Sequence, residues 1–247
     1  MRLTVLGGRG VWPGVEQACS GYVVEHDGFR LFVDPGYATL PRLLGRMSPG
    51  NVDAVLISHG HPDHCADLSP LLRARTLRDS PSPALPVYSL PRAVDAVLAL
   101  DDPEMLAGSY VLHTPTIGTR FEIGPFDTDT RLLPHFIPNI GVRLTAGGST
   151  LTYTGDTGPT PDLVDLARDA DLFLAEATFA RQVPEDYAGY LTSARDAGHM
   201  AAQAGVGRLV LTHLWPGTDT ESARQAAREG FDGEIRVAGR GLALDMA

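Results

Sequence analysis

Short apolar runs, separated by glycine, proline and acidic residues, recur along the first part of the chain and predict β-strands. The predicted strands cover residues 3–6, 21–25, 29–33 and 53–57, and a helix is expected over residues 39–46. Asp27-Gly28 separates two of these runs and is typical of a hairpin turn. The chain is therefore expected to begin with hairpin-connected strands.

The middle of the chain is less regular. A helical stretch after Asp67, a strand over residues 86–89 and a helix over residues 92–100 are expected. Residues 111–133 alternate β-branched and polar side chains between glycines and prolines, which predicts antiparallel strands. Residues 141–144 and 149–154 flank Gly147-Gly148, so a second hairpin is expected there.

Strands and helices alternate in the last third. We expect helices over residues 162–170, 193–204 and 221–229, and strands over residues 172–175, 208–212 and 234–238. Hairpins first and alternation later predict an α/β fold of two mixed sheets packed together, with helices outside. We treat residues 1–247 as a single domain.

Composition narrows the class of protein. The 43% hydrophobic and 20% charged content is typical of a soluble globular chain, and no apolar run reaches the roughly 18 residues of a membrane span. The chain starts directly with a strand-like run, which differs from an export signal. Its two cysteines, Cys19 and Cys65, imply no disulfide framework. These features predict a cytoplasmic protein without a membrane partner.

The net charge of −10 counts against a protein that grips nucleic acid by its phosphates. A local basic patch is conceivable at Arg42, Arg46, Arg73, Arg75 and Arg78, although a solvated helix face is the more common role of such residues.

The densest group of polar residues is the stretch 58–64, SHGHPDH, which follows the apolar run at residues 55–57. Its candidate ligands are His59, His61, Asp63 and His64. Imidazole nitrogens and carboxylate oxygens suit a divalent transition metal such as zinc. One segment rarely supplies four ligands to one ion, so the stretch predicts two metal ions.

A purely structural role is the alternative for each histidine. A single histidine at a strand end is more often a hydrogen-bonded core residue than a ligand. Four ionisable groups packed together differ, because burying them without a cation would be costly. Three more candidate ligands, His135, Asp156 and His213, each follow a predicted strand, and strand ends on one sheet edge can converge on a common site.

These residues resemble the metallo-β-lactamase-fold superfamily, in which His-x-His-x-Asp-His is the signature of a dinuclear metal site. The fuller match is to the ribonuclease Z and phosphodiesterase branch, through residues 134–141, 153–157, 171–179 and 209–213. The resemblance runs from Leu3 to about Gly217. It implies a four-layered α/β/β/α sandwich.

The resemblance also implies roles for the candidate ligands. One metal would be held by His59, His61 and His135, the second by Asp63, His64 and His213, and Asp156 would bridge both. The two ions would lie ~3.5–4 Å apart and share a hydroxide that attacks the substrate and that Asp63 orients. Redox members of the superfamily carry a glutamate at the position of His61, so the histidine favours hydrolysis with zinc, or with manganese as the alternative.

Two further residues receive a role on weaker grounds. Tyr190 stands where ribonuclease Z carries a proton-donating histidine, so its phenol is a candidate acid, and an ordinary half-buried tyrosine is an equal alternative. Asp34, just after a predicted strand, either orients a ligand histidine or caps a turn.

The activity that fits best is hydrolysis of a small or cyclic phosphodiester. A ribonuclease Z-like tRNA 3′ endonuclease is less favoured, because only a short hairpin fills the place of the tRNA-gripping arm and the net charge is −10. A lactone, thioester or β-lactam hydrolase is a second alternative, but those relatives place the third histidine in a Thr-Pro-Gly-His context that His135 lacks. A non-catalytic scaffold is the third. Dimers are common in the family, so a homodimer is left open.

Overall fold

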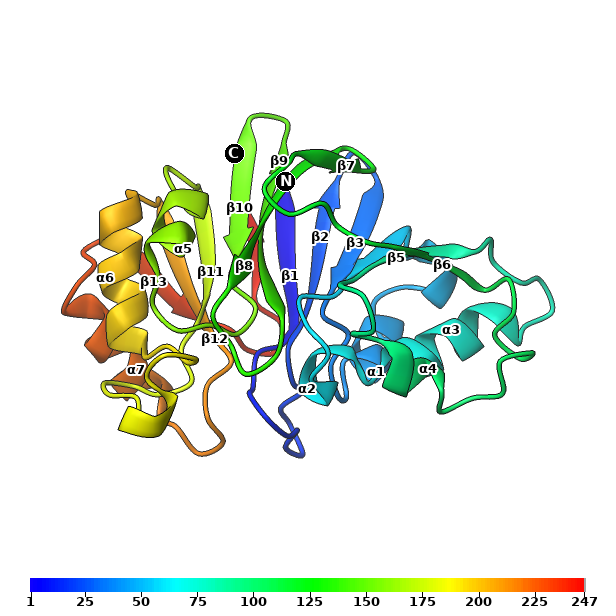
Figure 1. Cartoon of the computed structure of the whole chain (residues 1–247), viewed down its shortest axis with the longest axis horizontal. Coiled ribbons are helices and arrows are strands. Elements are labelled where there is room, and N and C mark those ends of the chain that lie inside the picture. Colours follow the sequence, from blue (N-terminus) through cyan, green and yellow to red (C-terminus); the bar gives the residue numbers. More distant parts are fainter. Residues whose placement is uncertain (247) are drawn as a thin grey trace.

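The structure is a computed structural model that describes residues 1–246, and it contains two seven-stranded β-sheets facing one another with helices on both outer sides (Figure 1). The first sheet contains, in spatial order, β14 (Ala243–Asp245), β1 (Arg2–Gly7), β2 (Gly21–His26), β3 (Phe29–Val33), β4 (Ala54–Leu56), β5 (Leu85–Tyr88) and β6 (Tyr110–His113). The second contains β13 (Glu234–Val237), β12 (Arg208–Thr212), β11 (Leu172–Glu176), β10 (Ser149–Tyr153), β9 (Asn139–Ala146), β8 (Phe126–Leu133) and β7 (Phe121–Ile123).

The helices divide between the two outer faces (Figure 1). The first sheet is covered by α1 (Leu40–Leu44), α2 (Pro62–Cys65), α3 (Leu68–Thr76) and α4 (Asp95–Leu98). The second is covered by α5 (Pro161–Leu166), α6 (Ala194–Ala204) and α7 (Thr220–Arg228). Short 3₁₀ turns occur at Pro49–Asn51 and Glu185–Tyr187.

Three separate apolar clusters hold the four layers together. Leu31, Ile140 and Leu174 belong to the cluster between the two sheets. The outer face of the first sheet packs on its helices through residues such as Phe32, and the second sheet does so through residues such as Phe173. Each sheet therefore buries both of its faces, and the predicted α/β/β/α sandwich is confirmed.

Most of the predicted helices and strands are present, and the differences occur where the pattern of neighbouring residues predicts the wrong element. The prediction of antiparallel strands over residues 111–133 is wrong at its start, because β6 pairs in parallel with β5 in the first sheet. Only β7 and β8 form the expected antiparallel pair there. The helix expected over residues 92–100 shrinks to α4, because Arg92 has a φ of 67°, which a right-handed helix does not allow. The edge strand β14 was not predicted.

The strand ends that matter for function lie on one edge of the sandwich. In the first sheet β3 and β4 run in parallel, and in the second sheet β10, β11 and β12 do so. β8 has the direction of β10, because both pair antiparallel with β9. The carboxyl ends of these strands meet at the lower edge in Figure 1.

The structure also bears on the cysteines and on membrane-spanning segments. Cys19 and Cys65 are both free and buried. Within residues 1–246, no helix has the length and apolar character needed to cross a membrane.

Candidate metal centre

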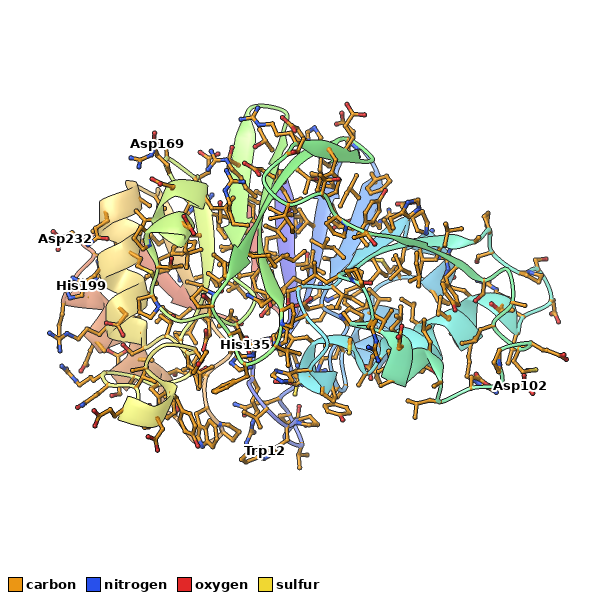
Figure 2. The ribbon with its side chains drawn as sticks, viewed as in Figure 1. Trp12, Asp102, His135, Asp169, His199 and Asp232 are labelled. Carbon is orange, nitrogen blue, oxygen red and sulfur yellow. The ribbon has the colours of Figure 1, made fainter. Side chains whose placement is uncertain are left out.

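The seven side chains singled out in the sequence come together at the carboxyl ends of the strands. They form two groups, His59, His61, His135 and Asp156, and Asp63, His64 and His213. Within each group one ligand atom from every residue lies within 4.8 Å of the others. His135 lies at the seam between the two halves of the molecule, whereas His199 lies on the outer helix α6 (Figure 2).

The first group is compact. Nδ1 of His61 is 3.1 Å from Nε2 of His59 and 3.1 Å from Nε2 of His135. Oδ2 of Asp156 lies 3.8 Å from Nε2 of His59 and 3.9 Å from Nε2 of His135. Three imidazole nitrogens and one carboxylate oxygen therefore face a common point.

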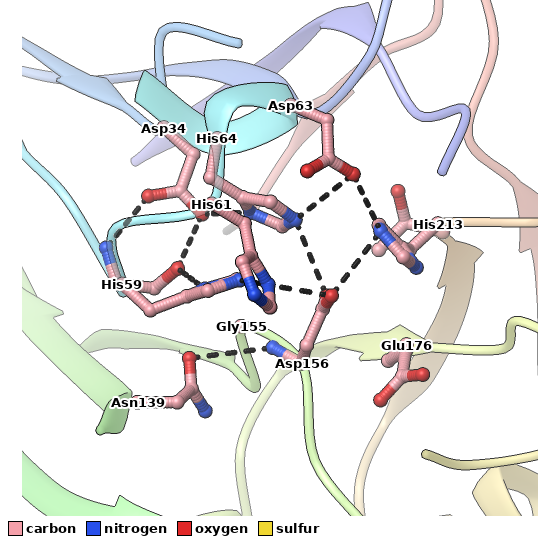
Figure 3. A network of polar contacts seen from close by, with 12 residues as sticks. Asp34, His59, His61, Asp63, His64, Asn139, Gly155, Asp156, Glu176 and His213 are labelled. Atoms are coloured by element: carbon pink, nitrogen blue, oxygen red, sulfur yellow. Dashed lines mark hydrogen bonds and ion pairs between the residues drawn. The ribbon is translucent and has the colours of Figure 1, made fainter. Parts of the chain in front are cut away.

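The second group is connected to the first through Asp156. Nε2 of His213 lies 3.1 Å from Oδ2 of Asp63 and 3.2 Å from Oδ2 of Asp156. Nε2 of His64 lies 3.7 Å from Oδ2 of Asp63 and 3.3 Å from Oδ1 of Asp156. The carboxylate of Asp156 is thus within reach of both groups, as Figure 3 shows for the second.

Two of these atoms are the best test of whether the centre fits a cation. Nε2 of His64 and Oδ1 of Asp156 are buried and, although they lie 3.3 Å apart, neither makes a hydrogen bond within the protein. Leaving such groups unpaired costs about 1–3 kcal/mol each, and more when they are charged. A divalent ion would satisfy both, and the nitrogen and oxygen donors are those that zinc accepts. The residues present therefore fit a divalent metal ion.

Asp34 supports the centre from behind. Its carboxylate is fully buried and accepts hydrogen bonds from Ser58 N (2.7 Å), Ser58 Oγ (2.6 Å) and Tyr153 OH (2.7 Å). It also accepts one from Nδ1 of His64 (2.8 Å), which lies beside it in Figure 3. A proton held on Nδ1 leaves the lone pair of Nε2 of His64 directed at the centre. The structure therefore gives Asp34 the contacts of a residue that orients a histidine.

Three of the other four histidines are oriented in similar ways. Oγ of Ser58 lies 3.0 Å from Nδ1 of His59, and Oγ1 of Thr178 lies 3.0 Å from Nδ1 of His213. The main-chain oxygen of Tyr190 accepts a hydrogen bond of 3.0 Å from Nδ1 of His135. In each case Nδ1 is occupied and Nε2 is free to face the centre.

Burial and neighbouring charges set the protonation of these groups. Burial and the charge of His64 lower the pKa of His59 well below its usual value, so this imidazole is neutral. Burial alone would lower the pKa of His64, but the carboxylates of Asp156 and Asp63 raise it well above the usual value. Burial opposes ionisation of Asp156, but His213 and His64 hold its pKa well below the usual range. In the absence of a metal ion, a proton on Nε2 of His64 thus occupies the position where the ion would bind.

Strained backbone positions deliver two of the seven side chains. Asp156 follows Gly155, whose φ is 57° and where a Cβ atom would lie 2.1 Å from Oδ1 of Asn139, so only glycine fits. His213 itself has a φ of 57°, which is uncommon for a residue with a side chain. The turn after β12 therefore places the imidazole at a conformational cost.

Tyr190 has a position at the rim of the centre. Its side chain is 43% exposed, and its ring lies 4.7 Å from that of Phe136. The contact that it makes with the seven side chains runs through its main-chain oxygen to His135. Its role as a proton donor stays a prediction.

Sequence reasoning missed several supporting residues. Ser58 and Tyr153 contact Asp34, and Thr178 joins His213 to the buried Glu176, whose Oε1 lies 2.6 Å from Oγ1 of Thr178. Ser58 directly precedes the first candidate ligand, so its position was a usable signal. Tyr153 lies 119 residues from Asp34, and nothing local indicates that contact.

Comparisons with known proteins show the family and the fold. A family model described as "Beta-lactamase superfamily domain" matches residues 29–214. The probable metallo-hydrolase YhfI of Bacillus subtilis is 31% identical over 98% of this chain and 98% of its own length. The crystal structure of YhfI superposes with a TM-score of 0.90, at 29% identity and over 99% of both chains. A ribonuclease Z of Halobacterium salinarum is 29% identical over 100% of this chain and 97% of its own.

Proposed function

The chain belongs to the β-lactamase superfamily and is a metallo-hydrolase of that fold, and from this premise we propose that it hydrolyses a small or cyclic phosphodiester at a centre of two divalent metal ions. The observation that carries the proposal is the pair of ligand groups that share Asp156. The similarity to a ribonuclease Z supports the phosphodiester as the bond that is cleaved.

The proposed ligands divide as the two groups do. His59, His61 and His135 would hold one ion, Asp63, His64 and His213 would hold the other, and the carboxylate of Asp156 lies within reach of both groups. Four of the seven residues come from one turn and α2, and three come from separate strand ends. The imidazole ligands suit zinc, and the carboxylates leave manganese as the alternative.

Bound divalent ions lower the pKa of a coordinated water from about 15.7 towards 7 and offset negative charge on the reacting phosphoryl group. The protein's own residues prepare the site for that chemistry. Asp34 keeps the proton of His64 on Nδ1, and Thr178 and Ser58 contact the corresponding atoms of His213 and His59. This support keeps the imidazoles in place while the substrate binds.

Two residues are proposed to act on protons or water. Asp63 orients the attacking water through its carboxylate, which Val11 N holds through a hydrogen bond of 2.7 Å to Oδ2. Tyr190 donates a proton to the leaving group, and its exposed ring packs on Phe136, whose ring in turn contacts that of His135, which is consistent with contact to a substrate. Tyr190→Phe tests this role, because it removes the phenol and leaves the main-chain contact to His135 intact.

The hairpin between β9 and β10 supports a small substrate over tRNA. Its turn consists of Gly147 and Gly148, both with positive φ, and the paired residues Ala146 and Ser149 close it directly. No inserted arm is present at this place in the described residues. A net charge of −10 also makes a large RNA contact less favourable.

The test combines metal content with turnover. We expect about two metal ions per chain by mass spectrometry of the purified protein, and cleavage of bis(p-nitrophenyl) phosphate. His64→Ala should lose metal and activity together, whereas His199→Ala, on the outer face of α6, should lose neither. Metal-loaded protein that cleaves no phosphodiester, while it turns over a lactone or thioester, would overturn the proposed bond but leave the metal pair standing.

A further inference from the structure

A cavity lined by arginines lies beside the candidate centre. Its volume is about 870 Å³, and it is bounded by the segment after β1, the segment after β12, the start of α7, and β13 with the residues that follow it. Its charged lining residues are Arg9, Arg42, Arg224, Arg236, Arg240, Glu16 and Glu221. None of the seven proposed metal ligands is among its lining residues.

A second hollow extends this basic region. A cavity of about 610 Å³ shares Glu16, Arg42 and Arg240 with the first and adds Arg46. The two hollows therefore adjoin at Glu16, Arg42 and Arg240. The concentration of arginine here contrasts with the net charge of −10 for the whole chain.

Two of these arginines lack a carboxylate partner. Arg9 donates from Nη1 to Oε1 of Gln17 at 2.6 Å, and its Nε is buried without a partner. Arg42 donates from Nη1 to the main-chain oxygen of Leu6 at 2.7 Å. Burial and the nearby charge of Arg240 lower the pKa of Arg42. Positive charge that repels itself is stabilised by a bound anion.

The other three arginines of the first cavity are paired with glutamates at the surface. Arg240 contacts Glu16 at 2.9 Å, and its side chain is 69% exposed. Arg224 contacts Glu221 at 2.6 Å, and Arg236 contacts the neighbouring Glu234 at 2.7 Å. Exposed ion pairs of this kind contribute little stability, so these guanidinium groups are free to turn towards a ligand.

We propose that this cavity binds a small molecule with two or more linked phosphate groups. Guanidinium groups bind phosphate oxygens through paired hydrogen bonds, and several of them line one hollow whose volume is typical of small-molecule sites. A single phosphate could contact only some of these guanidinium groups. A long RNA is less well matched, because Glu16 and Glu221 also line the cavity.

The cavity is distinct from the metal centre, but the two are connected by the segment that follows His213. Leu214 and Trp215 line the cavity and directly follow His213, and Leu214 accepts a hydrogen bond of 3.0 Å from Gly10 N. A bound ligand would therefore rest against the segment that carries one proposed metal ligand. The inference concerns binding alone and does not depend on the proposed hydrolysis.

Isothermal titration calorimetry of the metal-loaded full chain with tripolyphosphate tests the proposal, with orthophosphate as the comparison. We expect one tripolyphosphate per chain, and binding of orthophosphate at least roughly tenfold weaker. Arg42→Gln should weaken tripolyphosphate binding roughly tenfold or more, as should the double variant Arg236→Gln/Arg240→Gln. The double variant alters exposed side chains, so the test stands even if Arg42→Gln folds poorly.

Arg2→Gln and Arg120→Gln are matched controls, because both arginines are exposed and lie outside the cavity. They should bind tripolyphosphate as the unaltered protein does. No binding, or binding that survives the cavity substitutions and so belongs to the metal ions, would overturn the proposal. Preferential binding of a single-stranded RNA that depends on the same arginines would also overturn it, in favour of a nucleic-acid surface.

Discussion

Replacing Asp34 by asparagine should weaken metal binding without altering the shape of the site. Asp34 has a φ of 50°, a left-handed conformation that asparagine tolerates as well as aspartate does, so the backbone should stay in place. The carboxylate accepts hydrogen bonds from two donor groups of Ser58, from Tyr153 and from Nδ1 of His64. An asparagine side chain keeps one acceptor oxygen and introduces an N–H₂ group.

The position of that N–H₂ group determines the loss. If it faces His64, the Nδ1–H must go, and the proton moves to Nε2, where it blocks the lone pair directed at the metal. If it faces Ser58 instead, it opposes a main-chain N–H that cannot accept a hydrogen bond. Substitution of such supporting groups typically costs about 10–100-fold in metal affinity. That range corresponds to roughly 1.4–2.7 kcal/mol.

Competition of the protein with a chromophoric zinc chelator measures the effect. Tyr153→Phe is the first control, because it removes one donor and leaves the carboxylate of Asp34 intact. Asp67→Asn is the second, since Asp67 accepts its hydrogen bonds from Leu40 N and Thr39 Oγ1. Both controls should bind zinc nearly as the unaltered protein does. If folded Asp34→Asn protein also kept its zinc affinity within about twofold, the argument that Asp34 sets the tautomer of His64 would be refuted.

Three further predictions concern stability, thiol reactivity and pH. Arg75→Met should lower the free energy of unfolding, measured in urea, by about 3 kcal/mol, because the buried guanidinium donates hydrogen bonds to three main-chain oxygens. The control Arg73→Met removes an exposed ion pair and should lower it by less than about 1 kcal/mol. Burial raises the pKa of Cys19 and that of Cys65 from 9.0 to about 12, so at pH 8 both thiols should react with a thiol reagent only after unfolding, and rapid labelling of the native protein would contradict this. Because the pKa of His64 is raised, zinc must displace a proton from it, and the measured zinc affinity should fall as the pH is lowered. A zinc affinity that does not change with pH would show that this proton is absent.

Local patterns accounted for most of the secondary structure. The strand over residues 53–57, the hairpin at Gly147-Gly148 and the helix after Ser193 depend on apolar spacing, turn residues and caps that operate within a few positions. The prediction of strand pairing failed where the pairing depends on residues far away in the sequence. The direction of β6 depends on β5, about twenty residues earlier, and a short run of residues carries no information on its neighbour.

The amino-acid sequence alone determined the elements and the cluster of four candidate ligands at residues 58–64, because these depend on neighbours along the chain. It also pointed to His135, Asp156 and His213 through their place after predicted strands. Only the tertiary structure decided that all seven side chains meet, that Asp156 reaches both groups, and that Asp34 joins His64 to Tyr153. Such contacts join residues up to 150 positions apart, and they form only when the two sheets pack and bring their strand ends to one edge.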